Sequence, residues 1–394
     1  MKKLLVWVIA LALVASIGLA AVPGRLTIWC SEKQVGVLQR LGDEFEAQYG
    51  IPVDVVEVPF GDIQTKFLTA APAGEGPDII VGAHDRIAEL VVNGLLTPVD
   101  FLTARDKAEF MDTALEAFSY GGKLYGIPYA IEAMAFIYNK DYLPEPPKTM
   151  EEFLPIAKEY TSDEFRGFVY FAGNFYHSAA FLFAGGGYVF KMTDQGLDST
   201  DIGLANEGAI MGAEFIKQLY REGVLKIGDG YEIMDGLFKD GMAMAILNGP
   251  WAIADYKRAG IDYGIAPVPS INGYPGRPFT GVQGFMISSK SPNTLFAIDF
   301  LANFVNTQDV MYRIFLEDPR PPVRLDVLDM VKDEPDVAPF ANSAAFGIPM
   351  PNIPEMGAVW GSMDDALSQI INDQLPASEA LKQAVEKIRT ALGQ

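Results

Sequence analysis

An alternation of strand and helix patterns from residue 25 onward constrains the fold more than any other feature of this 394-residue chain. Residues 26–30, 53–58 and 78–81 are predicted to form strands. Between them, apolar side chains recur at helical spacing in segments that end near Gly50 and Ala71, and another helix follows the third strand. This β-α-β-α-β order predicts a parallel sheet with helices on its faces.

A similar order recurs later in the chain. Residues 208–221 predict an amphipathic helix, Asp235 is expected to cap a short helix, and residues 242–247 predict a buried strand. Strand-like pieces within 124–138 and 279–288 are expected to carry the chain between the two halves. We therefore expect an α/β fold of two lobes, each a mainly parallel sheet flanked by helices, joined by a multi-strand hinge. The expected divisions are a signal peptide over 1–21, an N-terminal lobe over 22–130 plus 285–330, and a C-terminal lobe over 131–284 plus 331–394.

The first residues predict an export signal. Lys2 and Lys3 precede an almost wholly apolar run over 4–20, and Ala20 and Ala21 offer small residues for cleavage. A retained membrane anchor is the alternative, but the apolar run is short for a bilayer span. We expect a periplasmic protein exported by a cleaved signal.

The net charge argues against some binding partners, and the single cysteine limits the covalent links that the chain can form. The formal net charge of −21 opposes binding to nucleic acid or to anionic lipid. Cys30 is the only cysteine, so no intramolecular disulfide is possible. Because Thr27-Ile28-Trp29 precede it rather than small residues, we expect Cys30 to be a buried thiol and not a lipid-bearing residue.

Four segments carry a resemblance to a known family. They are Gly74–Ile80 running into Ala83–Arg86; Glu132 with Ile137–Asp141 and Pro146–Thr149; Asn248–Trp251; and Met350–Pro354 running to Trp360. In this order and spacing they resemble the maltose/maltodextrin-binding proteins of bacterial ABC importers. The resemblance implies a non-catalytic receptor of two lobes that close around a ligand. It also implies an oligosaccharide ligand, a permease in the inner membrane as partner, a monomer, and no cofactor or metal.

The matched positions imply a set of ligand-binding side chains. A sugar needs hydrogen-bond acceptors and donors at its rim and flat aromatic rings against its faces. The implied acceptors are Glu32, Asp85 and Glu132, the donors Lys33 and Arg86, the stacking rings Tyr176, Trp251 and Trp360, and a further lining residue Met350. Glu32-Lys33 follow the first strand and Asp85-Arg86 follow the third. Trp251 follows the strand predicted over 242–247. These are the positions expected for ligand sites, which lie beyond the carboxyl ends of strands.

Each of these residues has a structural interpretation as well. Asp85 and Arg86 would also suit the start of a helix, Glu132 could be a solvated hinge residue, and Trp251 and Met350 could be core residues. The proline-rich segment over 319–322 is interpreted as a bend rather than a site.

The chain also departs from the family pattern. Gly82 stands where relatives carry tryptophan, residues 174–177 lack a carboxylate, and Gly361 and Asp364 replace a tyrosine and an arginine. The sequence therefore leaves the identity, length and linkage of the glycan open, with trehalose and β-mannan types as alternatives to maltodextrin.

Other functional classes fit less well. A secreted glycoside hydrolase needs one protonated and one ionised carboxyl, but Arg86 beside Asp85 favours the ionised form of that acid. The only two histidines, His84 and His177, lack metal-ligand spacing. A polyamine receptor would also use acids and aromatic rings, so only ligand binding itself distinguishes that alternative.

Overall fold

A computed structural model describes residues 20–394, which divide into two compact units. Unit 1 comprises the described residues up to Ala130 with Val282–Asp318 and Pro322–Val331; unit 2 comprises Ile131–Gly281, Pro319–Pro321 and Lys332–Gln394. The lobes expected from the sequence, with bounds after 130, 284 and 330, stay a prediction. Most of the expected signal peptide lies outside the described residues. No helix within 20–394 is both long and apolar enough to cross a bilayer.

Unit 1 is built on a sheet in the strand order β12-β3-β1-β2. β1 runs parallel to both β2 and β3, as the sequence predicts, and β12 runs antiparallel to β3. The elements are β1 Leu26–Cys30, α2 Glu32–Tyr49, β2 Val53–Glu57, α3 Phe60–Ala70, β3 Ile79–Ala83, η1 His84–Arg86, α4 Ile87–Val92, α5 Ala104–Lys107, α6 Asp112–Ala117, β4 Ser119–Tyr120, β5 Lys123–Leu124, α12 Thr294–Asp299, η3 Phe300–Val305, α13 Gln308–Glu317 and α14 Leu325–Val331. Two more strands, β6 Ile127–Ala133 and β12 Phe279–Ile287, have residues in both units.

The first strand and helix of unit 1 follow directly from the local sequence. Every residue of β1 is buried. The Ser31 hydroxyl caps α2 by accepting a 3.4 Å hydrogen bond from the Lys33 N–H, and Gly50 ends the helix at φ 73°. Cys30 is fully buried, and this burial raises the pKa of its thiol to about 12. The prediction of a buried thiol is therefore confirmed.

A buried polar cluster fastens the first described residues of unit 1. The side chain of Asn293 donates to the carbonyl oxygens of Val22 and Arg25, each at 2.8 Å, and accepts from the Gly24 N–H at 2.7 Å. It also donates to Asp78 at 3.1 Å. Since buried polar groups need partners, this one amide holds the chain entering β1 in place.

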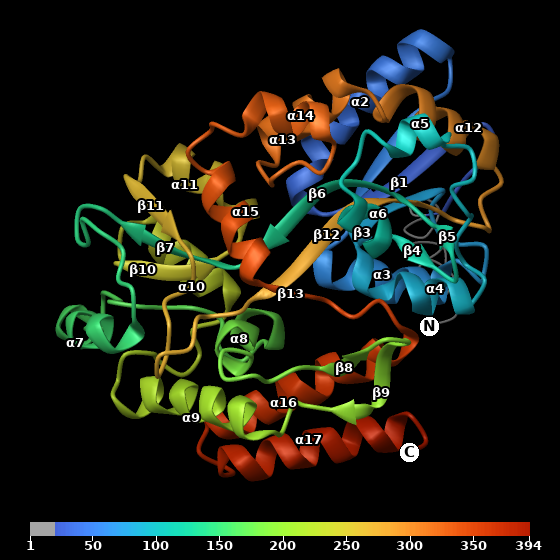
Figure 1. Cartoon of the computed structure of the whole chain (residues 1–394). Helices are drawn as coiled ribbons and strands as arrows, with labels where there is room; N and C mark the ends of the chain where they lie inside the picture. Colours follow the sequence, from blue (N-terminus) through green and yellow to red (C-terminus); the bar gives the residue numbers. More distant parts are fainter. Residues whose placement is uncertain (1–19) are drawn as a thin grey trace, which may run out of the picture. The chain divides into compact units, whose positions relative to one another are not determined.

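Unit 2 contains a small sheet in the order β10-β7-β11. Its elements are β7 Ala135–Asn139, α7 Met150–Tyr160, α8 Phe175–Leu182, β8 Phe190–Thr193, β9 Gly196–Ile202, α9 Glu207–Arg221, α10 Tyr231–Lys239, β10 Ala245–Asn248, η2 Pro250–Ala252, α11 Ile253–Ala259, β11 Tyr263–Ala266, α15 Val337–Phe346, β13 Ile348–Pro349, η4 Pro354–Ala358, α16 Val359–Ile371 and α17 Ala377–Ala391. Helices α8, α9, α16 and α17 form a group that packs pairwise, with α16 beside α17 (Figure 1).

Two local expectations are wrong in unit 2. Its sheet is not mainly parallel, because β7 runs antiparallel to both β10 and β11. Both partners return to β7 in the opposite direction after connections that contain helices, so a helical connection does not impose the parallel direction here. Asp235 does not cap a helix: α10 begins after Gly230 and places Asp235 in its interior, where it is buried.

Candidate functional site

In unit 1, four of the predicted site residues lie at one edge of the sheet. Glu32 and Lys33 are the first two residues of α2, directly after β1, and Asp85 and Arg86 lie in η1, directly after β3. Because β1 and β3 are neighbouring parallel strands, both pairs follow carboxyl ends at the same edge. This is the position that the sequence predicts for them.

The η1 turn is well anchored. His84 Nδ1 accepts a 3.1 Å hydrogen bond from the Val282 N–H of β12, and Asp85 is only 7% exposed. Arg86 reaches Glu89 at 3.3 Å, one turn later. The strand pairing and the His84 contact together hold this acid–base pair on rigid elements.

In unit 2, aromatic rings form a continuous row that contains all three predicted stacking residues. The centroids of Trp251 and Tyr176 are 6.2 Å apart, those of Tyr176 and Phe279 are 6.1 Å apart, and those of Phe279 and Trp360 are 5.5 Å apart. Tyr176, Trp251 and Trp360 are each partly exposed, whereas Phe279 is buried. Such a row offers several flat apolar faces side by side.

One end of the row carries a buried ion pair. The Nε–H of Arg320 donates to Glu132 Oε2 at 2.7 Å, and both side chains are 5% exposed. The guanidinium carbon of Arg320 lies 5.7 Å from the centroid of the Trp251 ring. The predicted acceptor Glu132 and the predicted stacking ring Trp251 are thus linked through a residue that the sequence analysis left out.

The turn that presents Trp251 rests on buried hydrogen bonds. Asn248 donates to the Tyr256 hydroxyl at 2.8 Å, and that hydroxyl donates to Asp235 at 2.8 Å. Asn248 also accepts from the Gly249 N–H at 2.9 Å. A side chain at position 249 would collide with the Trp251 ring, since a Cβ there would lie 2.1 Å from it. These contacts explain the spacing of the Asn-Gly-Pro-Trp motif. Asn248 anchors the turn, Gly249 leaves space for the indole ring, and Trp251 supplies that ring.

The helices that carry the other rings are also joined by polar groups. Asn174 caps α8 by accepting from the His177 N–H at 3.3 Å, and Asp364 of α16 accepts from the Phe175 N–H at 2.7 Å. Burial raises the pKa of Asp364, and the bond from Phe175 opposes that shift. Asp364 therefore serves the packing of α8 on α16.

Met350 lies under this site. It is 4% exposed, and its terminal methyl lies 3.1 Å from where a Cβ would stand at Gly281, as does the Glu132 side chain. Gly281 thus leaves room for both side chains. This position agrees with the packing interpretation of Met350, and its role in ligand binding stays a prediction.

The structure brings together all five predicted residues of unit 2 and adds four that the sequence analysis did not choose. Arg320 stands between Pro319 and Pro321, in the segment interpreted as a bend, although prolines that fix φ on both sides were a signal of a rigidly held side chain. The other three are Phe279, Tyr231 and His177. Tyr231 accepts from Trp251 Nε1 at 3.0 Å, and the His177 ring lies 6.0 Å from Tyr176.

His177 is held as a neutral ring. Its Nδ1 lies 2.9 Å from Asn174 Oδ1, and burial lowers the pKa of the imidazole to about 3. Its Nε2 is buried and has no hydrogen-bond partner. His177 is therefore an aromatic neighbour of the row and not a source of positive charge.

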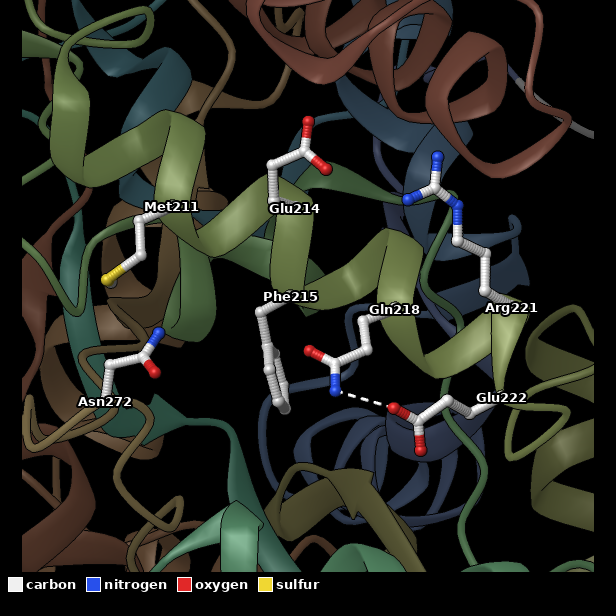
Figure 2. A pocket seen from close by; sticks show the side chains of 7 residues that line it. All are labelled: Met211, Glu214, Phe215, Gln218, Arg221, Glu222 and Asn272. Carbon is white, nitrogen blue, oxygen red and sulfur yellow. Dashed lines mark hydrogen bonds between the residues drawn. The ribbon is translucent and has the colours of Figure 1, made fainter.

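A separate hollow of about 450 Å³ lies along α9 (Figure 2). Its lining side chains are Met211, Glu214, Phe215, Gln218, Arg221, Glu222 and Asn272. Gln218 donates to Glu222 at 2.7 Å across its rim. None of the predicted site residues lines this hollow. Within residues 20–394, no three His, Cys, Asp or Glu side chains gather closely enough to hold a metal ion.

Comparison with known proteins identifies the class. The family described as bacterial extracellular solute-binding protein matches residues 40–339, and the chain belongs to this family. The maltotriose binding protein of Thermus thermophilus, solved with maltotriose bound, superposes with a TM-score of 0.89 at 37% identity, covering 94% of this chain and all of that one. The expected α/β fold of the periplasmic-binding-protein type is thereby confirmed.

Two curated relatives are similar over most of their length. The galactooligosaccharide-binding protein of Bacillus subtilis (strain 168) is 32% identical over 382 residues, which cover 94% of this chain and 89% of that protein. The maltotriose-binding protein of Pyrococcus abyssi (strain GE5 / Orsay) is 32% identical over 363 residues, which cover 89% and 78% respectively.

Proposed function

We propose that this protein is a non-catalytic receptor that binds maltose or maltodextrin-type oligosaccharides and delivers them to an ABC importer. The observation that carries the proposal is the aromatic row of unit 2, with its ion pair at one end. Three partly exposed rings suit the C–H faces of successive sugars, and the Glu132 carboxylate suits a hydroxyl. The Thermus and Pyrococcus relatives, both named for maltotriose, support an α-glucan ligand.

Unit 1 supplies the polar partners in this proposal. Asp85 and Glu32 would accept hydrogen bonds from sugar hydroxyls, and Lys33 and Arg86 would donate them. A hydrogen bond to a charged group contributes about 1.5–3 kcal/mol net, so three such bonds with stacking reach a micromolar dissociation constant, about −8 kcal/mol.

We propose that the protein is not an enzyme and that it is exported. Arg320 donates to Glu132, so this carboxylate already serves as a hydrogen-bond acceptor. The two curated relatives are named as binding proteins, which supports this part of the proposal. We further propose that the protein acts as a periplasmic monomer with its signal peptide removed, and that its partner is the permease of the importer. N-terminal sequencing of the exported protein would locate the cleavage point.

Tryptophan fluorescence provides the test of the ligand. Trp251 and Trp360 lie in the row, whereas Trp29 is buried in β1 of unit 1. Titration with maltose, maltotriose, maltotetraose, trehalose, a β-linked mannobiose and spermidine should give saturable changes with the α-glucans alone. A response to spermidine alone would refute the sugar receptor. Chromatography of maltotriose after prolonged incubation should show no products, and its breakdown would refute the non-catalytic assignment.

A second ligand class has its own support. The Bacillus relative is named for galactooligosaccharides and is as similar in sequence as the Pyrococcus protein. The departures at Gly82 and at 174–177 also make the site differ from the family pattern. A β-galactotriose belongs in the same panel, and binding of it in preference to maltotriose would keep the receptor and change the glycan.

A further inference from the structure

Arg320 occupies an unusual place in the chain. Its three-residue segment, Pro319–Pro321, belongs to unit 2, although the residues on both sides of it belong to unit 1. The carbonyl oxygen of Pro321 accepts a 2.9 Å hydrogen bond from the Ile131 N–H, so the segment lies against β6 beside Glu132. Prolines on both sides fix the backbone from which the Arg320 side chain projects.

The guanidinium meets two groups of different chemistry. Its edge donates to Glu132 at 2.7 Å, and its carbon lies 5.7 Å from the centroid of the Trp251 ring. Trp251 is also held from behind, because its Nε1–H donates to Tyr231 at 3.0 Å. Arg320 thus fixes the direction of a carboxylate and the plane of an indole at the same time.

Stability alone does not account for this arrangement. A buried ion pair gains little net free energy, because desolvation of both charges offsets their attraction. Its benefit is greatest where two groups must already have the correct geometry before a ligand arrives, since ordering them at the moment of binding costs affinity.

We infer that Arg320 is a positioning residue that sets the specificity of the glycan site, by holding Glu132 and Trp251 so that one sugar ring meets a carboxylate at its rim and an indole on its face. The inference rests on the proposed function. It adds a residue that acts through its two neighbours, and the geometry uses an extended, planar cation that meets the carboxylate with one N–H and the indole with its carbon. Lysine would offer only a point charge.

The chain provides a matched control in Arg324. This buried arginine also forms ion pairs, with the partly exposed Glu109 at 2.6 Å and Asp326 at 2.9 Å, and its guanidinium carbon lies 5.8 Å from the centroid of the Phe110 ring. All of these residues belong to unit 1, and none is a predicted site residue. R324M therefore imitates the structural loss of R320M without touching Glu132 or Trp251.

Maltotriose binding by wild type, R320M, R320K, W251F, R320M/W251F and R324M tests the inference by calorimetry, with thermal melting as a check on folding. We expect R320M to bind about tenfold more weakly or worse, R320K to recover only part of the loss, and R324M to stay within about twofold. If Arg320 acts through Trp251, the double variant should bind no more than about twofold more weakly than the weaker single variant.

The outcomes distinguish a failure of the inference about Arg320 from a failure of the proposed function. A wild type that binds while R320M binds equally well, or losses that multiply in the double variant, would overturn the role of Arg320 alone. A wild type that binds no glycan would instead refute the proposed function. Should R320M fail to fold, R320K carries the same comparison, because it retains the charge beside Glu132.

Discussion

Asp364 accepts a 2.7 Å hydrogen bond from the backbone N–H of Phe175, and this contact joins the helix of Trp360 to the helix of Tyr176. Phe175 is the first residue of α8, where N–H groups have no partner within the helix. Two rings of the aromatic row therefore depend for their spacing on one carboxyl group that is neither exposed nor paired with a cation in the structure described.

Replacement of Asp364 by asparagine tests this contact and its pH dependence. Burial raises the pKa of Asp364 above 3.8, so the carboxyl stabilises the fold most when protonated, and this contribution is lost as pH rises through the raised pKa. D364N keeps an acceptor for the Phe175 N–H without the buried charge. The unfolding free energy at pH 7 should be maintained or raised, and the fall in stability above pH 3.8 should become shallower.

Two further variants show whether the effect of D364N is specific to this contact. D364A leaves the Phe175 N–H without its acceptor and should lower the unfolding free energy by about 1–2 kcal/mol. The neighbouring Asp365 is exposed and pairs with Lys387 at 2.6 Å, so D365N should change stability by less than about 1 kcal/mol. Urea unfolding between pH 4 and 7.5 measures all three, and equal effects of D364N and D364A would contradict the capping role.

His177 should make the protein less stable as pH falls. Its folded pKa of about 3 lies below the ordinary value of 6.5, so stability is complete above pH 6.5 and is lost as pH falls toward 3. H177F removes the titrating group and keeps an aromatic ring against Tyr231 and Phe171, whose centroids lie 5.9 and 5.7 Å away. Urea unfolding at pH 7.5 and pH 5 should therefore show a smaller loss for H177F than for wild type. Parallel losses in the two proteins would show that other groups control the pH dependence.

Much of unit 1 could be predicted from sequence because its signals are local. The strand over 26–30 and the end of its helix at Gly50 agree with the structure, since an apolar strand run and a glycine at φ 73° need no knowledge of distant residues. The direction of β7 could not be predicted in the same way. Strand direction depends on which strands it pairs with, and both partners of β7, β10 and β11, lie more than 100 residues further along the chain.

The functional site likewise contains some residues that local sequence predicts and others that depend on distant parts of the chain. Asn248, Gly249 and Trp251 form a local motif, and the resemblance was enough to choose Trp251 as a candidate. Arg320 was not predicted as a site residue, because its partner Glu132 lies 188 residues earlier and the prolines around it indicate only a bend. No spacing in the sequence reveals that Phe279, a strand residue, closes the gap between Tyr176 and Trp360.

The Tyr256 hydroxyl should affect both stability and ligand binding. It donates to Asp235 and accepts from Asn248, both at 2.8 Å, beneath the turn that carries Trp251. Y256F leaves two buried polar groups poorly satisfied and should cost about 1–3 kcal/mol of unfolding free energy. Since the Trp251 turn then loses its anchor, glycan affinity should also fall.

Tyr263 provides the comparison for that affinity. Its hydroxyl donates to Asp336 at 3.0 Å, a bond of the same kind in the same unit, but it does not support the Trp251 turn. Y263F should lower stability and leave the dissociation constant unchanged within about twofold. Calorimetric titration of both variants distinguishes a specific loss from a general one; equal affinities for Y256F and Y263F would contradict the anchor.

Asn293 should control the order of the residues that lead into β1. Its side chain makes bonds of 2.7–3.1 Å to Gly24, Val22, Arg25 and Asp78. N293A leaves several of these groups unsatisfied and should reduce the unfolding free energy by about 2–4 kcal/mol. Amide exchange at Gly24, whose N–H loses its acceptor, should accelerate well beyond the rest of unit 1. The exposed Asn303, bonded only to Asp299 at 2.7 Å, gives a control in N303A, for which little change is expected.

The aromatic row predicts a graded response to glycan length. If successive sugars stack along Trp251, Tyr176 and Trp360, removal of a terminal ring should weaken longer glycans more than shorter ones, because only the longer ones reach it. Each of W251L and W360L should weaken maltotriose binding by about tenfold or more, given about 0.5–1.5 kcal/mol of ring-specific interaction beyond the lost apolar area.

The comparison between the two variants gives the direction of the glycan. Whichever of W251L and W360L leaves maltose binding unchanged while weakening maltotriose marks the far end of the row. W29F serves as the control, because Trp29 is only 2% exposed within β1 of unit 1 and should alter neither affinity nor the fluorescence change on binding. Equal losses for maltose and maltotriose in both variants would mean that a disaccharide already touches both rings, so the row would hold a short ligand and not a chain of sugars.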